Sequence, residues 1–250
     1  MSWNDTLRKR ARDLGLYGLL AHEKQTEIAC VEPLLDWEEE VRAQRSMERR
    51  LKAAHLGRFK SLSDFDWNWP LQCDRMAVEE AMSLDFVKEA GNIILRGPNG
   101  VGKTTLAKNL AYQALISGHT VLFTTAAEML GHLGATDSDS LLRSRLRYYT
   151  APMLLVIDEI GYLSYSNRYA DLLFAVINQR YEQRSTVVTT NRPFQEWADI
   201  FPSAACVVSL IDRLTHRADY IDIQAESYRL KESQEKAVMK QARRTKKNGA

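Results

Sequence analysis

Short apolar runs alternate with longer amphipathic segments between residues 92 and 224. Near-continuous apolar runs of this length are typical of strands that are buried on both faces of a sheet. The intervening segments are long enough to form helices that cover those faces. This pattern predicts an α/β fold with a five-stranded parallel sheet, whose strands are NIILRG (92–97), TVLFTT (120–125), MLLVIDE (153–159), STVVTTN (185–191) and DYIDIQ (219–224).

The first 60 residues contain no strand-like run, and their apolar residues recur at helical spacing. Leu7, Ala11, Leu14 and, more loosely, Leu19 follow an Asn-Asp helix start. A second helix is expected from near Pro33, because the acidic DWEEE segment and the later basic residues complement a helix dipole. The pattern predicts a small all-helical N-terminal domain.

Basic side chains recur along this second helix at intervals of three and four residues, at Arg42, Arg45, Arg49 and Lys52. Such spacing places them on one face as a basic stripe. An ordinary solvated helix face explains the stripe about as well as a binding surface does.

The expected organisation has three parts. Residues 1–60 form the helical domain, and residues 61–232 form the α/β domain. Within the latter, residues 61–73 are an ordered linker, because their aromatic side chains need a place to be buried. Residues 233–250 form a polar, basic tail that we expect to be partly disordered.

Charge is distributed unevenly although the net charge is only +2. Residues 1–60 carry twelve Lys/Arg against ten Asp/Glu, and residues 231–250 carry seven against two. Positive ends around an acidic centre suggest a polyanionic partner. No apolar run is long enough to span a bilayer, and the scattered cysteines favour a reducing compartment, so a cytoplasmic location is expected.

The segment GPNGVGKT follows the first predicted strand of the α/β domain. It fits the pattern G-x-x-x-x-G-K-[ST], whose backbone amides surround the phosphates of a nucleotide. Lys103 is expected to contact the β- and γ-phosphates, and Thr104 to ligate Mg²⁺. The predicted ATP-binding residues are Gly97, Pro98, Asn99, Gly100, Val101, Gly102, Lys103, Thr104 and Thr105.

Two adjacent carboxylates end the strand MLLVIDE. In an α/β sheet they are expected at the edge where ligands bind. Asp158 is predicted to hold Mg²⁺ together with Thr104, and Glu159 to orient and polarise the attacking water. The five histidines show no metal-ligand spacing, so no transition metal is expected.

Three further polar residues are candidates for the nucleotide site. Asn191 ends the strand VVTTN, where its amide could bind the γ-phosphate or the water, although Asn is also common in turns. Arg213 and Arg217 lie four residues apart on one predicted helix. Either could stabilise phosphoryl transfer, from the same subunit or from a neighbour, or simply cap a helix end. The choice between the two arginines stays open.

These motifs, in this order, resemble the IstB/DnaC-like AAA+ ATPases over roughly residues 5–232. The most specific segments are DEIGYL, TTNRPFQEW and AESYRLK, together with the phosphate loop. The chain is most similar to the IstB branch, the helper ATPases encoded beside the transposase in two-gene insertion sequences.

The resemblance implies an AAA+ core and roles for individual residues. Lys103 and Thr104 would form the Walker A pair, Asp158 and Glu159 the Walker B pair, and Asn191 the sensor. Arg213 would be the finger that completes the site of a neighbouring subunit.

The function expected from the resemblance is that of a bacterial ATPase that oligomerises on duplex DNA with ATP and assists a transposase in target selection and transposition. DNA contacts would be largely non-specific and salt-sensitive. The candidates are the helical-domain residues Arg42, Arg45, Arg49, Arg50 and Lys52.

Three alternatives remain. A DnaC-like helicase loader would use the same chemistry on a helicase ring and single-stranded DNA. A small-molecule phosphotransferase would need an arginine-rich lid, and the sequence shows no obvious insertion of that kind. A structural DNA-binding module would bind ATP without needing its hydrolysis.

Overall fold

The computed structural model describes residues 3–136, 138–162, 165–201 and 204–237, and the chain divides into two compact units, Met1–Lys52 and Ala53–Ala250. Residues 53–60, which the sequence pattern assigned to the helical domain, belong to the second unit. Ala54 and Leu56 are buried in its core, and the Ala54 carbonyl accepts a hydrogen bond from the Phe123 amide at 2.8 Å.

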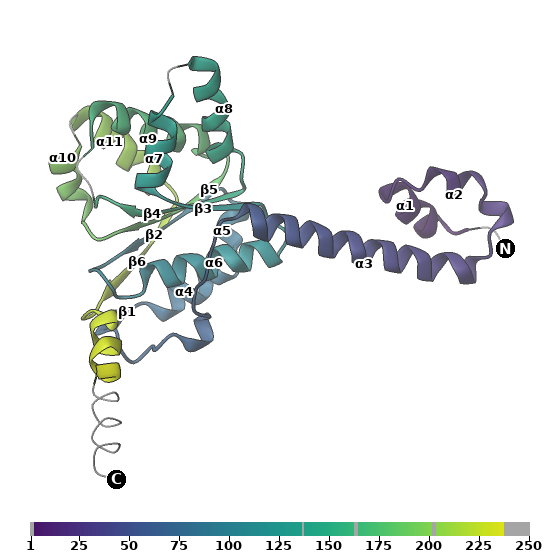
Figure 1. The fold of residues 1–250 in the computed structure, drawn as a ribbon, viewed down its shortest axis with the longest axis horizontal. Helices are drawn as coiled ribbons and strands as arrows, with labels where there is room; N and C mark the ends of the chain where they lie inside the picture. Colours follow the sequence, from purple (N-terminus) through teal and green to yellow (C-terminus); the bar gives the residue numbers. More distant parts are fainter. Residues whose placement is uncertain (1–2, 137, 163–164, 202–203, 238–250) are drawn as a thin grey trace, which may run out of the picture. The chain divides into compact units, whose positions relative to one another are not determined.

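The first unit is helical. It consists of α1 (Asp5–Asp13), α2 (Tyr17–Ala21), the 3₁₀ turn η1 (Glu23–Gln25) and α3 (Ile28–Ala53), which begins in this unit (Figure 1). The Asn4 side chain accepts a hydrogen bond from the Leu7 amide and caps α1. Side chains from α1, from α3 and from the residues next to the ends of α1 form a small core made of Trp3, Leu7, Ala11, Leu14, Val31 and Leu35.

The sequence pattern placed the start of this helix near Pro33, but α3 begins five residues earlier, at Ile28. Val31 precedes the proline and is fully buried against α1, as is Leu35 after it. Burial of Val31 in the small core therefore favours a helical conformation upstream of a residue that lacks an amide donor.

The second unit is built on a six-stranded sheet of order β1-β6-β2-β5-β4-β3. The five expected strands are present and parallel. The sixth, β1 (Gln72–Cys73), lies in the predicted linker and pairs antiparallel with β6 at the sheet edge. The five parallel strands are β2 (Asn92–Arg96), β3 (Val121–Thr125), β4 (Leu154–Ile160), β5 (Ser185–Thr190) and β6 (Ala218–Gln224).

Helices cover both faces of this sheet (Figure 1). Along β4, Leu154 and Val156 belong to the core on the α6 side, whereas Leu155 and Ile157 belong to the core on the α9 side. A strand buried on both faces explains the uninterrupted apolar run. The helices are α4 (Arg75–Met82), α5 (Asp85–Lys88) and α6 (Lys103–Ile116) on one face, and α7 (Ala126–Gly134), α8 (Asp139–Thr150), α9 (Asn167–Arg180), α10 (Trp197–Ile200) and α11 (Ala204–Thr215) on the other.

Two further segments complete the second unit. The linker contains a 3₁₀ turn, η2 (Leu62–Asp64), and its Phe65 and Trp67 pack partly buried against the core. Residues 228–237 are helical. Most of the tail that we expected to be partly disordered, residues 238–250, lies outside the described residues. No helix among the described residues is long and apolar enough to cross a membrane.

Candidate nucleotide-binding site

The glycine-rich loop joins the end of β2 to the start of α6. A Cβ on Gly97 would lie 2.2 Å from the Ile223 carbonyl oxygen, and one on Gly102 would lie 2.6 Å from the Phe65 ring. The close approach of β6 and of the linker therefore requires glycine at both positions. The loop leads directly into the N-terminus of a 14-residue helix, whose unpaired amides favour an anion.

Lys103 is folded back over this loop. Its Nζ donates to the carbonyls of Gly97 and Pro98, both at 2.7 Å, and the residue is 8% exposed. Burial lowers the pKa of Lys103, an effect that Asp158 and Glu159 oppose and Arg229 reinforces. The ammonium group is thus held at the loop by neutral acceptors that phosphate oxygens can replace.

Thr104 and Asp158 lie next to each other although they come from α6 and β4. The Thr104 hydroxyl donates to the Asp158 carboxylate, with oxygen separations of 3.0 and 3.1 Å. Asp158 is only 4% exposed. A hydroxyl and a carboxylate at this separation beside a phosphate loop are the oxygen donors that Mg²⁺ prefers, so these residues fit a magnesium ion.

A β-bulge separates the two acidic residues. In the ladder between β4 and β5, Ile157 pairs with Val188 but Ile160 pairs with Thr190, so Asp158 and Glu159 together face the single residue Thr189. Glu159 has a φ of 64°, in the left-handed region. Successive residues of a regular strand point to opposite faces, and the bulge instead lets the adjacent Glu159 reach the cavity.

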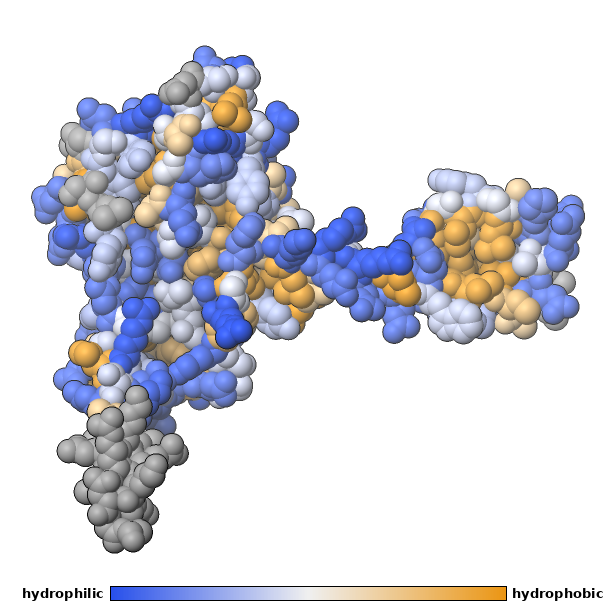
Figure 2. Space-filling view, in the orientation of Figure 1, coloured by the Kyte–Doolittle hydropathy of each residue, from blue (hydrophilic) through white to orange (hydrophobic). Residues whose placement is uncertain are grey.

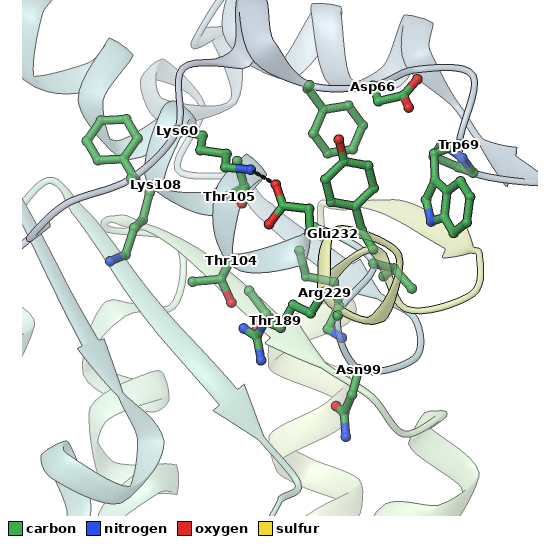
Figure 3. A pocket seen from close by; sticks show the side chains of 18 of the residues that line it. Lys60, Asp66, Trp69, Asn99, Thr104, Thr105, Lys108, Thr189, Arg229 and Glu232 are labelled. Atoms are coloured by element: carbon green, nitrogen blue, oxygen red, sulfur yellow. Dashed lines mark hydrogen bonds and ion pairs between the residues drawn. The ribbon is translucent and has the colours of Figure 1, made fainter. Parts of the chain in front are cut away.

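These elements line a cavity of about 480 Å³ (Figure 3). Its walls include loop residues 99–105, Glu159 and Asn191, with Thr189 and Thr190 of β5 at one side. The opposite wall comes from the linker and from the C-terminal helical segment, where Arg229 projects into the same space. Asp158 lies beneath this surface and meets it through Thr104.

Hydrogen bonds, ion pairs and ring contacts connect the linker to the C-terminal segment beside the cavity. The Trp69 indole donates to the Glu226 carbonyl at 2.9 Å, and its ring packs edge-on against Tyr228. Lys231 pairs with Asp66 at 3.1 Å and lies 4.2 Å from the centre of the Trp69 ring. Lys60 forms an ion pair with Glu232. We call these contacts between residues 60–69 and 226–232 the clasp.

The clasp is also tied to the phosphate loop. The Tyr228 amide donates to the Gly100 carbonyl at 3.0 Å, and a Cβ on Gly100 would lie 2.3 Å from the Ser227 hydroxyl. A ligand that moves the loop would therefore also move the C-terminal segment.

Sequence reasoning did not assign a role to several of these residues. Arg229 stands in AESYRLK, a segment used only as a family signature, and the linker aromatics were expected to be buried without a ligand role. The signal available was composition, because Trp, Tyr and Arg are enriched at binding surfaces. Thr189 carried no signal of its own, since it is one of two threonines before Asn191.

Arg213 does not line the cavity of its own chain. Its guanidinium donates to the Ser209 carbonyl at 3.1 Å within α11 and lies 4.8 Å from the centre of the Phe174 ring. Arg217 lies beyond the end of α11, 3.9 Å from the Glu182 carboxylate. Neither arginine is among the residues that line this cavity.

In the helical unit, the basic stripe of α3 lines a shallow hollow that is separate from the nucleotide cavity. Arg42, Arg45, Arg49 and Lys52 surround it. Arg42 is paired with Glu38 one turn away, at 2.5 Å. Arg50 differs from the others because its guanidinium donates to Ser46 at 2.7 Å and contacts Met47. Figure 2 shows mainly hydrophilic residues on the visible face of this stretch of α3.

A family model described as IstB-like ATP binding protein matches residues 15–236. The chain is 37% identical over 213 residues to the insertion sequence IS21 putative ATP-binding protein of Pseudomonas aeruginosa, covering 85% of this chain and 80% of the relative. It is 32% identical over 229 residues to the IS232 counterpart of Bacillus thuringiensis subsp. berliner, covering 90% and 91%.

Solved structures show where the fold recurs. DnaI aligns with a TM-score of 0.54 and 24% identity, over 66% of this chain and 90% of its own. The DnaC helicase loader aligns with a TM-score of 0.51 and 21% identity, over 70% and 99%. Replication initiator DnaA, bound to AMPPCP and single-stranded DNA, gives 0.52 and 21%, over 66% and 50%. At these identities the similarity establishes the α/β AAA+ fold.

Proposed function

The chain belongs to the IstB-like ATP-binding proteins, and from that premise we propose that it is the ATP-driven helper of a DNA transposition reaction in the bacterial cytoplasm. The family membership makes it an ATP-binding ATPase of the AAA+ fold. The proposal adds the metal, the DNA, the oligomer and the transposase.

One observation carries the proposal. A phosphate loop, a buried carboxylate beside the Thr104 hydroxyl, and an exposed second acid meet at one cavity, whereas the predicted finger Arg213 lies outside it. The first three features suit binding and hydrolysis of a magnesium–triphosphate. The position of Arg213 suits a site that a neighbouring copy completes.

Within this site each side chain has a distinct task. Lys103 would exchange its two loop carbonyls for phosphate oxygens, and Thr104 with Asp158 would hold Mg²⁺, which neutralises phosphate charge. Glu159 would orient the attacking water, and Asn191 at the end of β5 would fix that water or the γ-phosphate. Arg229 faces the same cavity and would add a positive charge from within the chain.

The DNA partner is supported by the basic stripe of α3. Four cations line one hollow on this helix, together with Ser46 and Glu48, and suit the phosphates of a duplex. Binding would be largely independent of sequence and strongly salt-dependent. The names of the relatives, which refer to insertion sequences, point to the transposase as the protein partner.

The test uses the Glu159→Gln variant of the full chain with ATP and duplex DNA. ATP should be retained while turnover is lost, and the ATP-bound protein should form oligomers on DNA that dissociate as salt rises. The double substitution Arg45→Glu with Arg49→Glu reverses two charges of the stripe. It should weaken DNA binding by about tenfold at moderate salt, because two phosphate contacts are lost. Changing Lys9→Glu with Lys24→Glu, which alters the charge equally elsewhere in the helical unit, should have little effect.

The outcome separates the alternatives. Recovery of the cognate transposase by the ATP-bound protein supports the proposal, whereas recovery of a replicative helicase ring would support a helicase loader. ATP turnover that ignores DNA and requires a small acceptor would indicate a phosphotransferase. Transposition that is unaffected by Glu159→Gln would show that hydrolysis is dispensable.

A further inference from the structure

Thr189 is the single residue of β5 that faces the bulge containing both acidic residues. It is fully buried. Its hydroxyl accepts a hydrogen bond from the Glu159 amide at 2.9 Å and donates one to the Asp158 carboxylate at 2.5 Å. One hydroxyl therefore contacts the side chain of the first acid and the backbone of the second.

The conformation of Glu159 needs such support. A non-glycine residue with a φ of 64° is uncommon, and a bulge leaves a backbone amide without its ladder partner. The Thr189 hydroxyl takes the place of that partner, because a buried amide without an acceptor is unfavourable. The direction of the Glu159 side chain follows from its backbone, so the hydroxyl helps to aim the carboxylate at the cavity.

We propose that Thr189 is a positioning residue for ATP hydrolysis: its hydroxyl fixes the bulge that turns Glu159 toward the attacking water, while leaving nucleotide binding largely to other groups. The proposal rests on the hydrolytic role proposed for Glu159. The hydrogen bonds from Thr104 to Asp158 do not involve Thr189. A change of Thr189 therefore leaves them in place at the proposed metal site.

Valine is the informative replacement. It has nearly the shape of threonine and is equally suited to a strand, so Thr189→Val removes the hydroxyl without opening a cavity. The Glu159 amide then loses its acceptor, and the carboxylate is no longer held in one direction. Thr189→Ser restores the hydroxyl and serves as the conservative rescue.

A purely structural role is the competing explanation, and β5 provides the control. Thr186 is also buried in this strand, at 2% exposure, and its hydroxyl accepts a hydrogen bond from Arg180 at 3.2 Å, far from the phosphate loop. Thr186→Val makes the same chemical change at a site outside the nucleotide cavity. Its effect should be on thermal stability, with the turnover number retained.

The experiment measures turnover with DNA present, equilibrium binding of a fluorescent ATP analogue, and thermal unfolding without nucleotide, for all four proteins. Thr189→Val should lower kcat by about 10- to 100-fold, the range expected for a misplaced catalytic group. The dissociation constant of the analogue should change by less than about threefold, because binding contacts remain. Thr189→Ser should stay close to the unmodified chain in both.

Two results of these measurements would overturn the proposal. One is a Thr189→Val protein with normal kcat. The other is an equal loss of kcat in Thr186→Val, which would reduce Thr189 to a strand residue that supports folding.

A crystal structure of the nucleotide-free Thr189→Val protein tests the positioning of Glu159 independently of the proposed function. Glu159 should leave the left-handed region there. If it keeps its conformation, the positioning role is excluded, even should the unmodified chain prove unable to hydrolyse ATP. If the backbone does change while the unmodified chain shows no hydrolysis, the positioning of Glu159 holds and the function proposed above fails.

Discussion

Lys103 shows how one side chain can occupy a phosphate site before the phosphate arrives. Its ammonium is buried and donates to two loop carbonyls. Burial lowers its pKa from the usual 10.5, because a charged amine loses hydration there. A bound triphosphate brings negative charge to the same place and should raise the pKa again. Nucleotide binding is therefore expected to take up a proton over part of the alkaline range.

The sign of this linkage gives a prediction. Affinity for ATP should be full below the lowered pKa of Lys103 and should fall as the pH rises through it, starting below pH 10.5. Lys103→Arg should bind more weakly overall but show a flatter pH profile, because a guanidinium stays charged throughout. Titrations of a fluorescent ATP analogue at several pH values measure both profiles. The same slope in both proteins would assign the proton uptake to another group.

At the scale of elements, the clasp joins two segments that are about 160 residues apart in the chain and places them beside the phosphate loop. A single ion pair at the surface, such as the half-buried pair of Lys231 with Asp66, contributes little by itself. The aromatic ring of Trp69, which contacts Tyr228, Lys231 and the Glu226 carbonyl together, is the centre of these contacts. We therefore expect the clasp to depend mainly on this one ring.

Trp69→Ala should release the C-terminal segment and weaken binding of the ATP analogue by about three- to tenfold, because an edge-to-face aromatic contact and a cation–π contact are lost with the cavity wall. Limited proteolysis should cut near residues 226–232 more rapidly, and ATP should slow that cleavage less than it does in the unmodified chain. Trp37→Ala, which truncates an exposed tryptophan in the helical unit, is the control. Unchanged proteolysis in Trp69→Ala would contradict the importance of the clasp.

At the scale of the whole molecule, the ATP site of one chain holds every expected group except the finger. Arg213 packs on Phe174 and Tyr181 at a surface of α9 and α11, outside the cavity. Head-to-tail contacts between identical chains bring different surfaces together and build rings or helical filaments. Such an assembly could present Arg213 of one copy to the nucleotide of the next.

Mixing two inactive variants tests this arrangement. Arg213→Ala lacks the finger but keeps the acids, and Glu159→Gln lacks the acid but keeps the finger. If Arg213 acts on a neighbour, the mixture on DNA should hydrolyse ATP faster than the sum of the two separate proteins, because some contacts pair an intact site with an intact finger. The same mixing with Arg217→Ala decides between the two arginines. Strictly additive rates would place the finger within its own chain or exclude it.

The sequence alone determined the features that depend on local pattern. Apolar runs located all five parallel strands, because strands buried on both faces leave a continuous signal, and the spacing of glycines, Lys103 and Thr104 located the phosphate loop between β2 and α6. Asp158 and Glu159 were recognised because two charges at the end of a buried strand are unusual. The short β1 was missed, since two residues carry no periodicity.

Only the tertiary structure decided how distant residues meet. Pairing of β4 with β5 in a shifted register places Thr189 opposite both acids, and folding of the C-terminal segment over the linker brings Arg229 and Trp69 to one cavity. These contacts depend on strand register and long-range packing. Many residues contribute to the free energies of both, so no single segment of the sequence predicts them. Local sequence patterns thus predict which chemical groups the site contains, whereas the assembled sheet sets the direction in which their side chains point.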